Sequence, residues 1–127
     1  MAAGGPDGKT RATRSGTGIF RPVQEAGIAA LTGPQESVEA RRATYEQRRD
    51  RAVEALKDVD AQSEGTFFVW FRLPDGMTSE RLLVEHRVAV APGEGFGQQG
   101  RGWARLSLAV TDETLDAGVQ RLVAAMR

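Results

Sequence analysis

The sequence predicts an α+β fold in which a small antiparallel sheet packs with helices, one of them long and amphipathic. Two observations carry this prediction. Residues 88–91 and 103–110 have strand composition and are joined by a glycine-rich loop, so they are expected to pair as antiparallel neighbours. Residues 34–59 carry apolar side chains at helical spacing on one narrow stripe and charged side chains elsewhere.

Residues 1–18 are rich in Gly, Ser, Thr and Arg and contain too little apolar surface to offset ordering, which predicts a flexible tail followed by a domain at 19–127. A short helix is expected over 24–31. Thr32 and Gln35 have capping-box spacing at the start of the long helix. The stripe of that helix comprises Val38, Tyr45, Ala52, Leu56 and Val59.

Residues 66–73 predict a strand that is apolar on both faces and therefore central in the sheet or covered twice. A short helix over 79–86 follows, with Thr78 as its cap. The last helix is capped by Thr111 or Asp112. Apolar residues recur along it at helical spacing; they are Leu115, Val119, Leu122, Val123 and Met126.

Composition excludes several classes of protein. The chain has 17 basic and 17 acidic residues, so no bulk charge points to nucleic acid or to an anionic membrane surface. It has no cysteine, hence neither a disulfide nor a thiolate metal site, and this fits a cytoplasmic protein. No apolar run approaches the length of a membrane span, and the N-terminus lacks a secretory signal.

Several motifs favour structural interpretations. Residues 3–10 match a loose phosphate-loop pattern, but no strand precedes them, so a tail is expected. His86 is the only histidine, which predicts a helix-end residue and no metal site. The aromatic side chains of the strand at 66–73 favour the core over a base-stacking platform. These are Phe67, Phe68, Trp70 and Phe71.

The glycines between 93 and 102 do not open a helix, so they do not form a dinucleotide fingerprint. Two interpretations stay open for them: a hairpin loop that needs positive φ angles, and a loop whose bare backbone approaches a ligand.

Arg105 is the main candidate binding residue. Strand alternation places it on one face with Trp103, Ser107 and Ala109, opposite Ala104, Leu106, Leu108 and Val110. An arginine at this place is expected either to reach water or a glutamate on a helix, or to bind a carboxylate bidentately.

Four segments together resemble the C-terminal small domain of class I/II aminotransferases, the pyridoxal-phosphate enzymes of the aspartate aminotransferase fold. The similarity is greatest to the diaminopimelate and alanine/aspartate branch. It runs from about Ser15 to the end of the chain. The segments that carry it are residues 15–26, 65–70, 90–97 and 103–108.

The resemblance implies that Arg105 binds the α-carboxylate of the substrate and that Gly95 and Phe96 border the substrate pocket. It implies pyridoxal 5'-phosphate in full-length relatives. The Schiff-base lysine motif of the family is missing here, and neither Lys9 nor Lys57 stands in its place. No catalytic, cofactor-binding or metal residue is therefore assigned to this chain.

The expected function is that of a truncated aminotransferase, whose parental reaction transfers an amino group between an amino acid and a 2-oxo acid. The chain alone is expected to be inactive. The alternative is a non-catalytic interaction module that self-associates or complements a separate large domain. The expected partners are accordingly the amino acid and 2-oxo acid of the parental enzyme, a homodimer mate or a large-domain chain.

Overall fold

The computed structural model describes residues 18–127. The chain divides into two compact units, Met1–Gln35 and Glu36–Arg127. The phosphate-loop-like segment at 3–10 lies outside the described residues. No helix in the described part of the chain is long and apolar enough to cross a membrane.

The described part of the first unit is centred on helix α1, Arg21–Thr32, with Pro22 in its first turn, where a missing N–H costs nothing. The helix is longer than the predicted 24–31. None of its residues is buried, and its apolar side chains Val23, Ile28 and Leu31 are exposed.

The capping box predicted between Thr32 and Gln35 is not formed, because Thr32 is the last residue of α1 rather than a helix N-cap. Its hydroxyl donates back to the Ile28 carbonyl at 2.8 Å. The Gln35 amide donates to the Ala30 and Gly33 carbonyls at 3.0 and 2.8 Å. The bond to the Ala30 carbonyl satisfies one of the last four carbonyls of α1, which have no partner within the helix.

The second unit begins with α2, Glu36–Ala55, which ends four residues before the predicted limit at residue 59. Leu56 is buried, and Val59 packs against the core from the turn after the helix. That turn closes with the Val59 amide donating to the Leu56 carbonyl at 3.0 Å. The predicted stripe is buried only toward the C-terminal end, since Val38 is exposed.

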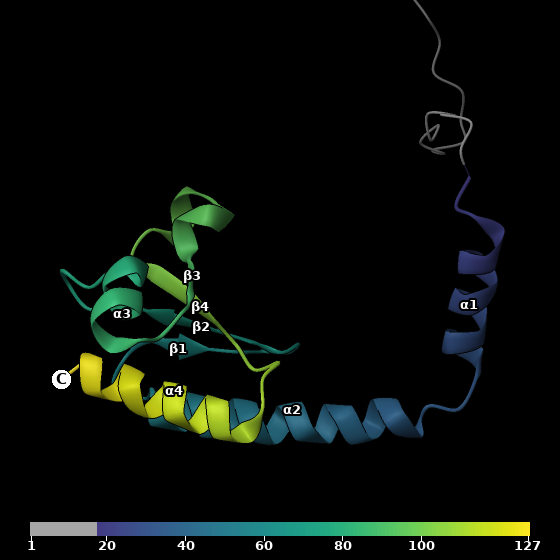
Figure 1. Cartoon of the computed structure of the whole chain (residues 1–127), viewed down its shortest axis with the longest axis horizontal. Coiled ribbons are helices and arrows are strands. Elements are labelled where there is room, and N and C mark those ends of the chain that lie inside the picture. The colour runs from purple at the N-terminus through teal and green to yellow at the C-terminus, as the bar shows by residue number, and fades with distance from the viewer. Residues whose placement is uncertain (1–17) are drawn as a thin grey trace, which may run out of the picture. The chain divides into compact units, whose positions relative to one another are not determined.

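The sheet has four strands in the order β1-β2-β4-β3, and every pairing is antiparallel (Figure 1). β2, Phe68–Arg72, is central, as its apolar faces predict. β4, Trp103–Ser107, pairs with β2 on one side and with β3, Ala91–Pro92, on the other. β1, Ala61–Gln62, was not predicted, because two residues give no readable periodicity.

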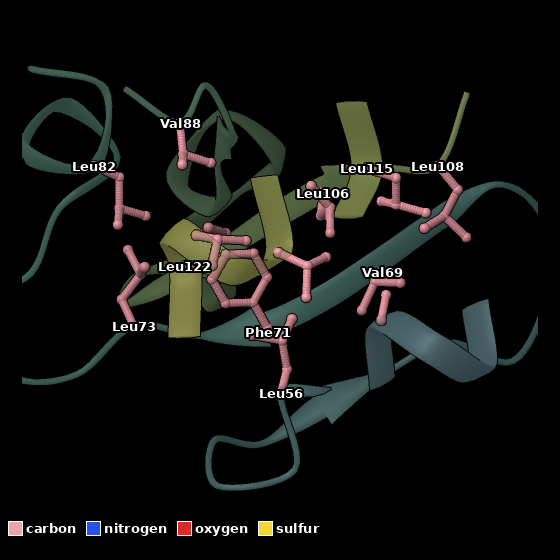
Figure 2. Close-up of a cluster of buried hydrophobic side chains, with 13 residues drawn as sticks. Leu56, Val69, Phe71, Leu73, Leu82, Val88, Leu106, Leu108, Leu115 and Leu122 are labelled. Carbon is pink, nitrogen blue, oxygen red and sulfur yellow. The ribbon is translucent and has the colours of Figure 1, made fainter. Parts of the chain in front are cut away.

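The two faces of the sheet differ. On one face, Val69, Phe71, Ala104 and Leu106 are buried. Figure 2 shows Phe71 among the leucine and valine side chains of this core, which include Leu122 of helix α4, Asp112–Ala125. Figure 1 shows α2 and α4 lying side by side along the sheet.

Helix α3, Ser79–His86, packs against α4, and both helices have the predicted threonine caps. The Thr78 hydroxyl accepts from the Arg81 amide at 3.1 Å, and the Thr111 hydroxyl accepts from the Thr114 amide at 3.3 Å. These bonds satisfy N–H groups that a helix start leaves free. His86 is the last residue of α3, the predicted helix-end position.

Candidate functional site

A pocket of about 600 Å³ opens on the other face of the sheet. Its walls are Phe68 and Trp70 of β2, Arg105 of β4, Phe96 and the segment 62–66. Trp70 and Arg105 are directly opposite each other in the β2–β4 register. Because Phe68 is two residues from Trp70, all three side chains project from the same face.

The guanidinium of Arg105 lies between two aromatic rings. Its Cζ atom is 3.9 Å from the centroid of the Phe68 ring and 4.3 Å from that of Phe96. Trp70 meets the Phe96 ring edge-on, with centroids 5.4 Å apart. Strand alternation predicted the face of Arg105 correctly, but the side chain neither pairs with a helix glutamate nor extends freely into water.

Arg105 differs from the arginines that form ion pairs on the helices of the second unit. Arg48, Arg51 and Arg81 all donate to carboxylates, at 2.9, 2.7 and 3.0 Å. Within residues 18–127 no carboxylate lies within ion-pairing distance of Arg105. Stacking occupies the faces of a guanidinium, whereas its N–H donors point outward in the plane. Arg105 is thus a half-buried cation whose N–H donors point outward in the plane of the guanidinium, away from the two rings.

The glycine-rich segment forms two short 3-10 turns, η1 (Gly93–Phe96) and η2 (Gln98–Gly100). A Cβ atom on Gly93 would collide with the Gly100 and Trp103 carbonyls, and one on Gly100 would collide with the Gly93 backbone. Gly97 and Gly102 have φ angles of 123° and 78°, which favour glycine. Positive φ angles, as the hairpin-loop interpretation expects, account for Gly97 and Gly102, whereas close contact with the loop's own backbone accounts for Gly93 and Gly100.

Of the three residues implicated by the sequence, the structure brings Arg105 and Phe96 together. Gly95 is next to Phe96 in η1 but is exposed and does not line the pocket. A Cβ atom on Gly95 would meet open space.

Phe68 and Trp70 are pocket residues that sequence reasoning placed in the core. Of the four aromatic residues at 67–71, only Phe71 is buried there. Strand alternation could have identified Phe68 and Trp70. They are two residues apart and so lie on the same face of β2, and Trp70 is paired with Arg105 on β4. A strand that is apolar on both faces hides this signal.

A second pocket of about 600 Å³ lies between β4, α4 and the segment 87–89 that follows α3. Arg87 and Arg121 are among its lining residues, and Arg121 donates to the Arg87 carbonyl at 3.3 Å. This pocket lacks the aromatic rings that hold Arg105.

The carboxyl groups with lowered pKa values lie outside the Arg105 pocket. A hydrogen bond from Arg48, with further donation from Arg51, lowers the pKa of Asp112. A hydrogen bond from Arg81 lowers the pKa of Glu85. Both shifts belong to ion pairs on the helices. No cluster of metal-ligating side chains occurs among the residues that the structure describes.

The fold and the pocket together define a small α+β domain with an arginine held against two aromatic rings on the sheet face opposite the core. The family model for aminotransferase class I and II matches residues 10–122, and the chain belongs to this family. It is 40% identical to LL-diaminopimelate aminotransferase of Moorella thermoacetica over 84% of this chain and 29% of that protein. The corresponding Maridesulfovibrio salexigens enzyme is 41% identical over the same shares.

Solved structures agree. An aminotransferase from Staphylococcus aureus superposes with a TM-score of 0.75 and 34% identity, over 86% of this chain and 31% of that chain. An aromatic aminotransferase from Pyrococcus horikoshii gives a TM-score of 0.73 and 33% identity, over 81% of this chain and 30% of that one. The chain thus spans about 30% of the length of the proteins it matches.

Membership of this family implies pyridoxal phosphate as the cofactor of the full-length proteins. The residues that the structure describes in this chain do not fit that cofactor. The cofactor is held through a lysine amine. Lys57 is the one lysine in residues 18–127, and it is an exposed residue paired with Glu54 at 2.8 Å, away from the pocket lining. Lys9 lies outside the described residues.

Proposed function

We propose that this chain is the carboxylate-binding part of a pyridoxal-phosphate-dependent aminotransferase. In this proposal Arg105 binds the α-carboxylate of an amino acid or 2-oxo acid, and Phe96 forms a wall of the pocket. The observation that carries it is the Arg105 guanidinium, stacked at 3.9 and 4.3 Å between two rings and without a carboxylate partner among residues 18–127. The names of the relatives support the class of reaction.

The proposed role of Arg105 is binding and orientation. Two parallel N–H donors of a guanidinium match the two oxygens of a carboxylate, which fixes the direction of the ligand as well as its position. The remainder of the ligand would then lie along Phe68, Trp70 and the segment 62–66, which line the same pocket. We include Gly95 in the substrate-binding loop because no side chain there blocks approach to Phe96.

A binding measurement tests this proposal. Calorimetric titration with pyruvate should give saturable, about millimolar binding to the chain, and Arg105→Ala should abolish it. Arg72→Ala is the matched control, because Arg72 lies on the same sheet face but does not line the pocket. Equal loss in both variants would contradict a specific role for Arg105.

We further propose that the chain alone does not catalyse amino transfer, because no lysine amine lines the pocket among residues 18–127. Purified protein mixed with pyridoxal phosphate, an amino acid and 2-oxoglutarate should form no new amino acid above the protein-free control. Transfer that disappears in Arg105→Ala would overturn this part of the proposal.

The alternative function is a non-catalytic interaction module that self-associates or complements a large-domain chain. The observation that favours it is a set of exposed apolar side chains in and before α1, where a monomer normally scatters such residues singly. They are Ile19, Phe20, Val23, Ile28 and Leu31. Sedimentation equilibrium should then detect dimers or larger species, and a monomer at every concentration would contradict self-association.

A further inference from the structure

We infer that Phe68 and Phe96 are positioning residues that hold the Arg105 guanidinium in the plane in which it can donate two hydrogen bonds to a carboxylate. This inference rests on the proposed carboxylate binding and deepens it. It assigns a role to Phe68, which the family resemblance left unassigned, and gives Phe96 a role that acts through Arg105.

The two rings reach Arg105 from independent elements. Phe68 is on β2, and its backbone pairs with Ser107, two residues from Arg105 on β4. Phe96 is the last residue of η1, in the loop between β3 and β4. The Trp70 ring packs against the Phe96 ring at an interplanar angle of 80°, so Phe96 also contacts β2. The guanidinium is therefore held by the sheet on one side and by the loop on the other.

The stacked arrangement suits a carboxylate because it restricts the cation without using its donors. Aromatic rings attract a guanidinium through its faces, and this attraction strengthens when the cation loses water. The N–H groups at its edge stay free for a bidentate partner. An unstacked arginine would lose much more rotamer freedom on binding, since its side chain is long and flexible.

The test combines two readouts on the whole chain labelled with ¹⁵N and ¹³C. The first is the ring-current displacement of the Arg105 side-chain NMR signals in the absence of ligand. The second is the dissociation constant for pyruvate. Phe68→Leu and Phe96→Leu should each reduce the displacement and weaken pyruvate binding about five- to tenfold. Phe68→Tyr, which keeps the ring, should retain both.

Phe67→Leu is the matched control. Phe67 contacts the Phe68 ring, with centroids 4.4 Å apart, and it does not line the pocket. Its removal tests whether any loss of aromatic packing weakens binding. Phe96→Leu guards against misfolding, because the Phe96 side chain is exposed in a loop and is not part of the core.

The outcomes separate the two proposals. If wild-type chain binds pyruvate and the Leu variants at 68 and 96 bind as tightly as Phe67→Leu, the positioning role is wrong and the carboxylate site stands. If Phe68→Tyr binds as weakly as Phe68→Leu, the positioning role is also wrong. If wild-type chain does not bind pyruvate, the carboxylate site itself is wrong and the positioning role falls with it.

Discussion

Gly93 and Gly100 lie close together in the loop between β3 and β4, and both residues are buried. Each α-carbon faces the backbone of the other, so neither position has room for a methyl group. Phe96, the second ring beside Arg105, lies between these two glycines in the chain.

Gly100→Ala should therefore destabilise the protein by about 1–3 kcal/mol, as overpacked sites do, because backbone atoms must move. Thermal unfolding followed by circular dichroism measures the effect. Gly95→Ala is the control in the same loop, since its Cβ would meet no atom and its φ is not positive. A similar melting temperature for Gly100→Ala and Gly95→Ala would contradict the close contact.

Single residues differ in how far the sequence predicts them. The face of Arg105 follows from alternation alone. Phe68 could not be assigned to the pocket, because β2 is apolar on both faces and its local pattern does not say which face the helices cover. Contact between Phe96 and Arg105 depends on the path of a glycine loop, which propensity does not define.

At the scale of elements, α2 and α4 are joined by a cluster of charged side chains. Arg48, of which only 15% of the side chain is exposed, donates to Asp112 at 2.9 Å and to the Leu108 carbonyl at 3.1 Å. Arg51 donates to Asp112 at 2.7 Å and to Asp116 at 3.4 Å. Asp112 also lies in the first turn of α4, where a negative charge is favourable.

The lowered pKa of Asp112 sets the pH dependence of this cluster. Its stabilisation is present above the unfolded-state pKa of about 3.9 and is lost as pH falls through the lower folded-state value. Asp112→Asn should thus lower the melting temperature at pH 7, and this difference from the wild type should shrink as the pH falls below the unfolded-state pKa. Asp75→Asn, in an exposed turn, should track the wild type throughout. A difference for Asp112→Asn that is independent of pH would contradict this explanation.

Elements with strong local signals were predicted well. Thr78 and Thr111 cap α3 and α4, and the antiparallel pairing around the glycine loop follows from composition, although the first of these strands is Ala91–Pro92 rather than the predicted 88–91. The end of α2 was predicted too late, because Leu56 and Val59 continue the apolar stripe although the chain already turns. Two-residue strands such as β1 form only because a neighbouring strand is present, so sequence periodicity cannot reveal them.

At the scale of the whole molecule, the two units differ in how their helices are stabilised. α4 buries Leu115, Val119 and Leu122 in the core of the second unit. α1 buries nothing, and an isolated 12-residue helix is marginal in water. The second unit also contains every residue of the buried cluster.

Hydrogen–deuterium exchange of the whole chain should therefore find α1 amides exchanging much faster than those of α4 when the protein is dilute. Peptides covering residues 21–32 and 112–125 give the comparison within one sample. Slow exchange of α1 that is independent of protein concentration would contradict the absence of buried contacts. Protection that grows with concentration would favour the interaction module.

We propose Arg105 as the site at which this chain binds carboxylates. NMR titration of the ¹⁵N-labelled chain with pyruvate, followed at the arginine Nε signals, can locate the bound carboxylate. We predict a saturable shift of the Arg105 signal together with the backbone amides of Phe68 and Phe96. A saturable shift at Arg87 and Arg121 instead, with Arg105 unchanged, would place binding in the second pocket and contradict the claim.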